Sequence, residues 1–317
     1  MLKAFVQTVF CVACAAASVR ADEVTRFDPR MADAAAVVDT NGVKWIDGRL
    51  LPLEGKAVAD TATYYERMPT GVTERVNGGV RSMKVHTAGL QFRFRTDSRH
   101  VRFQWRNDRT ERMMPNMARS GHSSIDVYRR GADGRWRFVK TGCFRDTKKG
   151  GDLSLDWTPG EDCLVNLPLY NGIAFFRLGI DQTASVSALP PRMSGVTKPV
   201  VFYGTSITQG ASASRPGMSF VNIVGRDLDV PVVNLGFSGS GKMELEMADW
   251  LARIDASCYV LDCLWNMGAA EDTPDCKDIA DKSDPQGMLH TRFEPFVRKL
   301  RAARPDVPIV LAERTLI

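Results

Sequence analysis

The pattern of apolar and polar positions changes its character near residue 194. From about Asp22 to Met193, apolar and polar residues alternate with a period of two, which is typical of β-strands with one buried face. The predicted strands span residues 90–96, 100–106, 123–130, 135–141 and 172–180, with turn signals at 131–134 and 148–152. No convincing helical pattern interrupts them. This region is therefore predicted to be a β-sandwich or jelly roll.

A linker rich in Pro, Gly and Ser at residues 188–199 ends this pattern. Beyond it, runs that are apolar throughout predict strands, and amphipathic runs predict helices between them. The predicted strands span 200–204, 230–236, 258–264 and 307–313, and the predicted helices span 219–228, 243–254 and 290–305. Such an alternation calls for a parallel sheet covered on both faces. We therefore expect a β domain at 22–193 and an α/β domain at 194–317.

The first 21 residues have the layout of a secretory signal peptide. One lysine precedes an apolar run from Ala4 to Ala17, and the small residues Val19 and Ala21 stand at the −3 and −1 positions of a cut after residue 21. The run is shorter than a bilayer-spanning helix, and no later stretch is apolar enough to span a membrane. We predict a secreted or periplasmic protein, with a lipoprotein cut before Cys14 as the alternative.

Charge and cysteine content narrow the range of functions. The net charge is +5 over 317 residues, and in the stretch 92–112 arginines alternate with apolar residues, as on the solvated face of strands. A nucleic-acid site would need a concentrated basic patch and a recognisable motif, so no nucleic-acid partner is predicted. No Cys-x-x-Cys pair occurs after the predicted signal peptide, so we predict no metal site and no cofactor.

Five cysteines remain after the predicted signal peptide. In an exported protein Cys143 and Cys163 could bridge neighbouring strands, although the pairing is left open. Cys258 and Cys263 lie in a buried-strand pattern and are interpreted as small core residues. The odd number leaves at least one thiol without a partner in the chain.

The stretch "VFYGTSITQG" at 201–210 places Ser206 just beyond a predicted buried strand. Ligand and catalytic sites of parallel sheets lie at the carboxyl ends of the strands. A glycine turn leads from Ser206 towards a helix start, where free N–H groups favour negative charge. Ser206 is therefore a candidate nucleophile, although a Gly-x-Ser turn taken alone is more often an ordinary connection.

Two similar junctions follow the next two predicted strands. "NLGFSGSG" contains Gly239, and "LDCLWNM" contains Asn266. The backbone N–H groups of Ser206 and Gly239 and the side-chain amide of Asn266 could together hold a tetrahedral oxyanion. Other motifs fail here: a nucleophile elbow needs glycine where Thr208 stands, and a P-loop needs Ser or Thr where Met243 stands.

The three segments "GTSITQG", "NLGFSGSG" and "LWNM", in this order, resemble the first three blocks of the SGNH (GDSL-type) hydrolases. The stretch "GHSSIDVYRR" is similar to the Gly-x-Asp-Leu-Tyr signature of the jelly-roll module that precedes one branch of them. The resemblance implies a flavodoxin-like hydrolase domain with Ser206 as nucleophile and Ser206, Gly239 and Asn266 as the oxyanion hole. It also implies a metal-independent esterase, and exported members with two domains often remove acetyl groups from polysaccharides.

The resemblance also implies a base that the sequence does not supply. The family places it in an Asp-x-x-His motif near the C-terminus. The only such run here, Asp97 to His100, lies in the predicted β domain, and His290 has Gly287 three residues upstream. His290 is interpreted as a surface residue at a helix start. Because "AERTLI" follows directly on a predicted strand, we expect a fragment of a longer protein, with little or no esterase activity of its own.

Two other functions stay open. The chain could be a non-catalytic carbohydrate-binding or cell-surface protein, which labelling of Ser206 with a fluorophosphonate would distinguish from an esterase. A lipase would carry large apolar loops near Ser206. The small, polar stretch "ASASRPGMS" at 211–219 favours a small acyl group instead.

Overall fold

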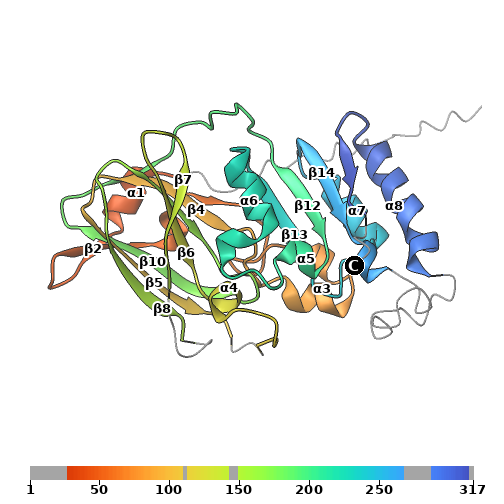
Figure 1. Ribbon diagram of the computed structural model, residues 1–317, viewed down its shortest axis with the longest axis horizontal. Coiled ribbons are helices and arrows are strands. Elements are labelled where there is room, and N and C mark those ends of the chain that lie inside the picture. The colour runs from red at the N-terminus through yellow and green to blue at the C-terminus, as the bar shows by residue number, and fades with distance from the viewer. Residues whose placement is uncertain (1–26, 110–112, 143–148, 268–286, 314–317) are drawn as a thin grey trace, which may run out of the picture.

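The computed structural model describes residues 27–109, 113–142, 149–267 and 287–313. Figure 1 shows an antiparallel β region on the left and an α/β region on the right, packed against each other along the long axis of the molecule. The predicted signal peptide and Cys143 lie outside the described residues. No helix in the described part of the chain is both long and apolar enough to cross a membrane.

The β region consists of two antiparallel sheets packed face to face. One has the order β1 (Val37–Val38), β2 (Val43–Asp47), β10 (Ile173–Asp181), β5 (His100–Asn107), β8 (Gly151–Asp156). The other has the order β11 (Val186–Ala188), β4 (Gln91–Thr96), β9 (Asp162–Asn166), β6 (Asp126–Arg130), β7 (Trp136–Thr141), and β3 (Leu53–Glu54) pairs with β4. Alternate side chains of both sheets point into the space between them. Phe92 of one sheet thus contacts Phe176 of the other, with ring centroids 4.5 Å apart.

All five strands predicted in this region are present, with ends shifted by up to three residues. Two of the predictions are wrong. The predicted turn at 148–152 overlaps the start of β8, and short helices do interrupt the strands. These are α1 (Pro29–Ala34), α2 (Thr70–Thr73), α3 (Gly78–Met83) and α4 (Arg119–Ser123). Each is at most six residues long, which is too short to produce a recognisable helical period.

The α/β region contains a parallel sheet of order β13 (Val232–Gly236), β12 (Val200–Gly204), β14 (Cys258–Asp262), β15 (Ile309–Leu311). Helix α6 (Phe220–Asp227) packs on one face through Val221, and α7 (Leu245–Leu251) and α8 (Met288–Ala303) pack on the other. The predicted parallel sheet with helices on both faces is confirmed. Gly204 lies in register with Gly236 and Asp262, so three strands end at the same level.

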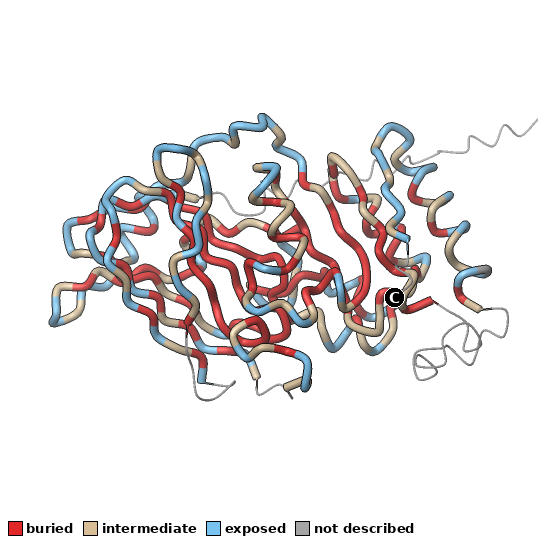
Figure 2. Tube along the Cα trace, in the orientation of Figure 1, coloured by how far each residue is buried: buried red, intermediate tan, exposed pale blue. Residues whose placement is uncertain are grey.

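One segment of the β domain is buried in the hydrophobic core of the α/β region. Between β3 and β4 the chain leaves the sandwich and runs along the parallel sheet, so that α3 (orange in Figure 1) lies among the elements of the α/β region. Val72, Val76 and Val80 of this segment belong to the same buried cluster as Trp250 and Phe296. In Figure 2 buried residues accordingly continue from the sandwich into the parallel sheet. We call the segment 55–86 the core excursion: it belongs to the sandwich by sequence, and most of its buried apolar side chains pack in the α/β core, whereas Tyr65 packs in the sandwich core.

The three described cysteines are free thiols. Cys163 lies fully buried in β9, and no disulfide is formed by it. Cys263 is buried as expected of a core residue, whereas Cys258 is half-buried. Burial raises the pKa of the Cys163 and Cys263 thiols well above the ordinary value, so both stay protonated at neutral pH.

Candidate active site

Ser206 lies at the carboxyl edge of the parallel sheet, two residues beyond the end of β12. It begins α5 (Ser206–Gln209), whose N-cap residue Thr205 accepts a hydrogen bond from the Ile207 N–H over 3.2 Å. The turn leaves no room for a side chain at Gly204, because a Cβ there would lie 2.1 Å from the Thr208 hydroxyl oxygen. The helix that begins at Ser206 is a single turn long. Negative charge is therefore favoured here by the N–H groups of this turn and not by the dipole of a long helix.

A buried pair ties this turn to the neighbouring strand. The Thr208 hydroxyl donates to Asp262 Oδ2 over 2.6 Å, and the Thr205 N–H donates to the Asp262 carbonyl oxygen over 3.1 Å. Burial raises the pKa of Asp262, and the hydrogen bond from Thr208 opposes that rise. The position of Ser206 is therefore fixed from β14 as well as from β12.

Gly239 lies in the turn that follows β13. The turn is closed by hydrogen bonds from the Ser240 and Gly241 N–H groups to the Phe237 carbonyl oxygen, at 2.9 and 3.1 Å. Gly239 has φ +65°, a left-handed conformation that favours glycine, and a Cβ there would have no neighbour within 4 Å. Gly239 thus presents its backbone towards open space at the same edge of the sheet as Ser206.

The backbone N–H groups of Ser206 and Gly239 make no hydrogen bond with the described residues. Within 237–241 every N–H except that of Gly239 has an acceptor among the described residues, and the N–H of Ser206 has none either. Ser206 is the first residue of α5, where a backbone N–H has no intrahelical acceptor, and Gly239 lies in an open turn, so both donors are available to a ligand. They are the two donors that the sequence analysis assigned to the oxyanion.

Asn266 ends the short helix η3 (Leu264–Asn266) after β14, and its side chain packs against the Gly239 turn. Its amide oxygen accepts from the N–H groups of Ser240 and Gly241, at 3.2 Å each. The opposite amide orientation would make a single 3.4 Å bond to the Gly241 carbonyl oxygen, so we assign the orientation with two bonds. Asn266 is buried and belongs to the same cluster of loops as Ser206 and Gly239.

None of the histidines with a described side chain lies in the position of a base for Ser206. His86 Nδ1 is 2.9 Å from Gln209 Nε2, and His122 Nδ1 is 2.6 Å from the Ser123 hydroxyl. His100 pairs with Asp181 on the far sheet of the sandwich. The side chain of His290, in the first turn of α8, lies outside the described residues, so its interpretation as a surface residue stays a prediction.

Two residues of the β region contact this site without any signal for it in the sequence. Arg67 and Tyr170 are both buried, and both reach the strand ends beside Ser206 from the sandwich side. Neither belongs to a local motif, and each contacts residues far away in the sequence. Only the spatial arrangement of the two regions shows their position.

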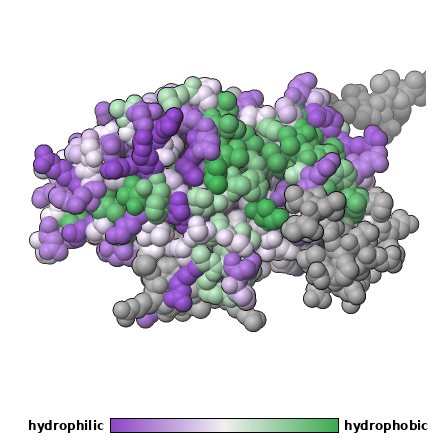
Figure 3. All heavy atoms as spheres, in the orientation of Figure 1, coloured by the Kyte–Doolittle hydropathy of each residue, from purple (hydrophilic) through white to green (hydrophobic). Residues whose placement is uncertain are grey.

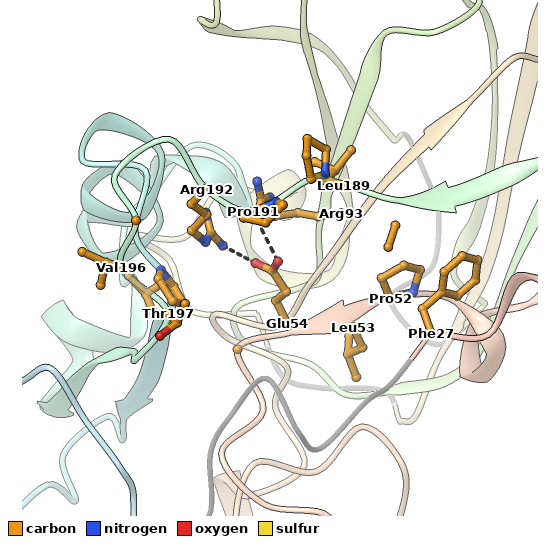
Figure 4. Close-up of a pocket in the computed structure, with 16 residues that line it drawn as sticks. Phe27, Pro52, Leu53, Glu54, Arg93, Leu189, Pro191, Arg192, Val196 and Thr197 are labelled. Carbon is orange, nitrogen blue, oxygen red and sulfur yellow. Dashed lines mark hydrogen bonds and ion pairs between the residues drawn. The ribbon is translucent and has the colours of Figure 1, made fainter.

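A cavity of about 430 Å³ lies at the opposite edge of the parallel sheet. Its lining includes Val232, the first residue of β13, together with Glu54, Arg93 and Arg192. Figure 4 shows Glu54 between the two arginines. The cavity is therefore separated from Ser206 by the length of the sheet. In the described ranges, no group of three or more His, Cys, Asp or Glu side chains is arranged to hold a metal ion.

A serine beside free backbone donors at the carboxyl edge of a parallel sheet is the arrangement that a serine acyl hydrolase requires. Residues 197–316 match the GDSL-like Lipase/Acylhydrolase family, and residues 43–186 match the N-terminus of Esterase_SGNH_hydro-type, named GxDLY. The chain therefore belongs to the SGNH (GDSL-type) hydrolases with a GxDLY-type N-terminal domain, as the motifs indicated. The membership supports a hydrolase of the esterase type.

Two solved structures have a similar fold. A protein described as a GDSL-like lipase from Bacteroides ovatus ATCC 8483 is 29% identical, with a TM-score of 0.69 over 85% of this chain and 73% of that chain. The salicylyl-acyltransferase SsfX3 from a tetracycline biosynthetic pathway is 18% identical, with a TM-score of 0.63 over 86% and 72%. The latter likeness concerns the fold alone. Among curated proteins, none matches the chain significantly.

Proposed function

We propose that the chain is a serine carboxylic-ester hydrolase whose nucleophile is Ser206. The observation that carries the proposal is the pair of unpaired N–H groups, on Ser206 and Gly239, at neighbouring strand ends. Unpaired donors held by a rigid scaffold are what an oxyanion hole requires, because they need no rearrangement when charge develops. The amide of Asn266 is the third proposed donor, since its oxygen is fixed by the Gly239 turn and its NH₂ group faces away from those two N–H groups.

In the proposed mechanism the Ser206 hydroxyl oxygen attacks the ester carbonyl carbon. The carbonyl oxygen becomes an oxyanion and accepts hydrogen bonds from the Ser206, Gly239 and Asn266 donors. Collapse of this intermediate breaks the bond to the leaving alcohol, which takes up a proton, and leaves an acyl-serine. Attack by water then releases the acid and restores Ser206.

The base that takes the Ser206 proton is the one component without a candidate among the described histidines. The Ser206 hydroxyl makes no hydrogen bond to any described residue, so nothing in that part of the chain activates it. A serine hydroxyl is a weak nucleophile without an adjacent base. We therefore propose a Ser-His-Asp mechanism whose C-terminal Asp-x-x-His segment is not contained in these 317 residues, so that they alone turn over esters slowly or not at all.

The proposed substrate is a small acyl ester, such as an acetyl group, on a carbohydrate outside the cytoplasm. Support comes from the small side chains of 211–219 beside Ser206, from the family resemblance and from the signal-like first 21 residues. The neighbouring Ile207 is 45% exposed and offers a limited apolar contact, which suits a short acyl chain. Release of acetate from acetylated glycans, but not of long fatty acids from esters, is the expected outcome. Preference for the long chain would overturn it.

Fluorophosphonate labelling followed by intact mass tests the nucleophile. Imidazole added to the 317-residue chain supplies the absent base, so we expect labelling at residue 206 to be at least about tenfold faster with imidazole than without it. Ser206→Ala should remove the adduct, whereas the exposed, nearby Ser212→Ala control should keep it. A cooperatively folded chain that is never labelled at Ser206 would favour the carbohydrate-binding alternative. Fast p-nitrophenyl acetate turnover without imidazole, abolished by Ser206→Ala, would contradict the absent base.

We also propose that the β domain, residues 22–193, is a jelly roll joined to the hydrolase domain at 194–317. The support is the strand order of its two four-stranded cores, β2-β10-β5-β8 and β4-β9-β6-β7. This is the order expected when a long hairpin is folded over twice into two Greek keys. A proteolytic cut in the linker at 188–199 tests the boundary, and the core excursion should keep the two pieces associated after the cut.

A further inference from the structure

Tyr170, in the turn between β9 and β10 of the sandwich, reaches across to both loops of the proposed oxyanion hole. It is 5% exposed, and its own N–H is fixed by a 3.0 Å hydrogen bond to the His122 carbonyl oxygen. Its hydroxyl donates to the Ser206 carbonyl oxygen over 3.3 Å; burial raises its pKa, and a side-chain hydrogen bond from Ser238 opposes that rise. A single buried hydroxyl therefore contacts the loop of Ser206 and the loop of Gly239.

Ser238 is held from a second side by Gln209. The Ser238 N–H donates to Gln209 Oε1 over 2.9 Å, and Gln209 Nε2 donates to the Leu169 carbonyl oxygen over 3.0 Å. Gln209 Nε2 also lies 2.9 Å from His86 Nδ1. Leu169 and His86 belong to the β region, as Tyr170 does. Ser238 is thus held by Tyr170, which belongs to the β region, and by Gln209, which is itself bonded to the β region.

The anchoring of Ser238 decides the direction of the Gly239 N–H. That N–H lies in the planar peptide group that joins Ser238 to Gly239, so it turns only as that plane turns. Because Gly239 has no Cβ and adopts φ +65°, its own side of the plane offers little resistance. The fixed side chain and N–H of Ser238 are then what holds the plane in place.

We propose that Tyr170 is a positioning residue of the Ser206 site, which orients the Gly239 N–H through Ser238 and fixes its distance from Ser206. The proposal rests on the proposed function and assigns the β domain a part in the catalytic geometry. Tyr170 itself contacts neither substrate nor reacting atoms. Burial raises its pKa to about 12, so the hydroxyl can donate throughout the neutral range.

Loss of the hydroxyl should therefore slow acylation without weakening substrate binding. Removal of an oxyanion donor lowers rates by about 100- to 1000-fold, and a donor that is misdirected rather than lost should cost about tenfold. Tyr170→Phe removes the hydroxyl and keeps the ring. Ser238→Ala removes the same hydrogen bond from the other side and serves as the second variant. The matched control is Tyr65→Phe, because Tyr65 is equally buried in the sandwich and its hydroxyl makes no hydrogen bond with the described residues.

Two measurements on the whole chain test the proposal. Fluorophosphonate labelling in imidazole gives the maximal labelling rate and the apparent affinity separately, and hydrogen exchange follows the Ser238 and Ser240 N–H groups. Tyr170→Phe and Ser238→Ala should each lower the maximal rate about tenfold, change the affinity less than about twofold and accelerate exchange at both sites about tenfold. Tyr65→Phe should do none of these.

The outcomes separate the two proposals. If Tyr170→Phe and Ser238→Ala behave as Tyr65→Phe does in both measurements, the positioning role is overturned. If the unaltered chain is never labelled, the proposed function fails, and the exchange rates alone decide whether Tyr170 orders the Gly239 turn. If Tyr170→Phe does not fold, Ser238→Ala decides.

Discussion

Two of the contacts between the sandwich and the α/β region differ in their chemistry. The carboxyl-edge contact, beside Ser206, is formed by Arg67, Tyr170 and Gln209 and contains no carboxylate on the sandwich side that pairs with them. The linker-side contact is formed by Glu54, Arg93, Arg192 and Asp229 at the cavity of Figure 4, and it consists of ion pairs. The first places a catalytic loop by hydrogen bonds, and the second holds the regions together by opposite charges.

At the carboxyl edge, Arg67 is a buried cation held only by carbonyl groups and an aromatic ring among the described residues. Its guanidinium donates to the carbonyl oxygens of Asn234, Gly236 and Met83 over 3.0, 3.1 and 3.0 Å, and it lies 4.7 Å from the Phe237 ring centroid. Burial lowers the pKa of Arg67 to about 9, which leaves it charged at neutral pH. The carbonyls at the end of β13 are thus fixed by the core excursion.

At the linker side, each charge has an opposite neighbour. Glu54 accepts from Arg93 over 2.8 Å and from Arg192, and Asp229 lies 3.4 Å from Arg192. Burial opposes ionisation of Glu54, but the charges of both arginines outweigh it and lower its pKa. The comparison teaches that acid should weaken the linker-side contact before it affects the carboxyl-edge contact.

The largest expected effect comes from Arg67→Met. The variant leaves three carbonyl oxygens without their donor, so the free energy of unfolding should fall by roughly 4 kcal/mol. Labelling of Ser206 should fall as well, because the end of β13 loses its support. Urea unfolding measures the first effect. Arg49→Met, at an exposed ion pair, should cost less than about 1 kcal/mol, and equal losses for the two variants would contradict the comparison.

Asp126 tests whether every carboxylate at the boundary behaves as Glu54 does. It accepts from the Gly217 N–H over 2.7 Å and from Asn166 Nδ2 over 2.8 Å, and Arg215 Nε is 3.7 Å away. Burial raises its pKa to about 6, against the effect of these hydrogen bonds. The folded pKa lies above the unfolded one, so stability should decrease as the pH rises from about 4 to 6 and stay constant above, by roughly 3 kcal/mol in total.

In Asp126→Asn this decrease should be absent from urea unfolding curves recorded between pH 4 and 7. The control Asp133→Asn alters an exposed carboxylate whose pKa is lowered by Arg137, and the decrease should persist in it. A decrease that persists in Asp126→Asn would assign the titration to another group.

Glu54→Gln should act in the opposite direction with pH. At pH 7 it leaves the buried Arg93 and Arg192 without their shared carboxylate, which should cost roughly 2 kcal/mol. Because the folded pKa of Glu54 is lowered, the unaltered protein has this stability above about pH 4.5 and loses it as the pH falls through the folded pKa. The variant and the unaltered protein should therefore converge in acid. The exposed Glu294→Gln provides the control.

The smallest expected effect is at Asn77, where the core excursion meets the Gly239 turn. Asn77 caps α3 by accepting from the Val80 N–H over 3.0 Å, and its amide donates to the Ser240 carbonyl oxygen over 2.9 Å. Asn77→Ala should cost about 1 kcal/mol and accelerate exchange at the Ser240 N–H. Ser219→Ala, which removes the cap of α6, should cost a similar amount without that acceleration. If exchange at the Ser240 N–H is unchanged in Asn77→Ala, the core excursion does not stabilise the Gly239 turn.

The sequence predicted the α/β region well because its signals are local. The apolar runs of β12, β13, β14 and β15 and the amphipathic run of α8 each appear within a dozen or so residues. The candidate donors on Ser206 and Gly239 followed from their places after strands of a parallel sheet. The three strand ends are in register, which is why residues about 30 positions apart in sequence lie at one edge.

The parts that the sequence did not predict depend on contacts between distant segments. Arg67 contacts Asn234 and Gly236, and Tyr170 contacts Ser206, but neither residue stands in a periodic or motif-like surrounding. The same holds for Val72, Val76 and Val80, which lie in or between short helices and share a buried cluster with residues 201–300. Hydrophobic periodicity shows that such a side chain is apolar. It does not show which region of the molecule buries it. Figure 3 adds that apolar side chains gather on the α/β side of the visible face, whereas the sandwich side is mainly hydrophilic.

The core excursion has a consequence for synthesis on the ribosome. Residues 57–80 emerge early, yet the apolar partners that cover them, such as Trp250 and Phe296, are made much later. At about 5–20 residues per second this delay is on the order of ten seconds or more, long compared with the folding of an isolated domain. The N-terminal half therefore cannot finish folding as an independent unit while it is being translated. Nascent chains halted before α7 should bind chaperones through this segment and release them once α8 has emerged.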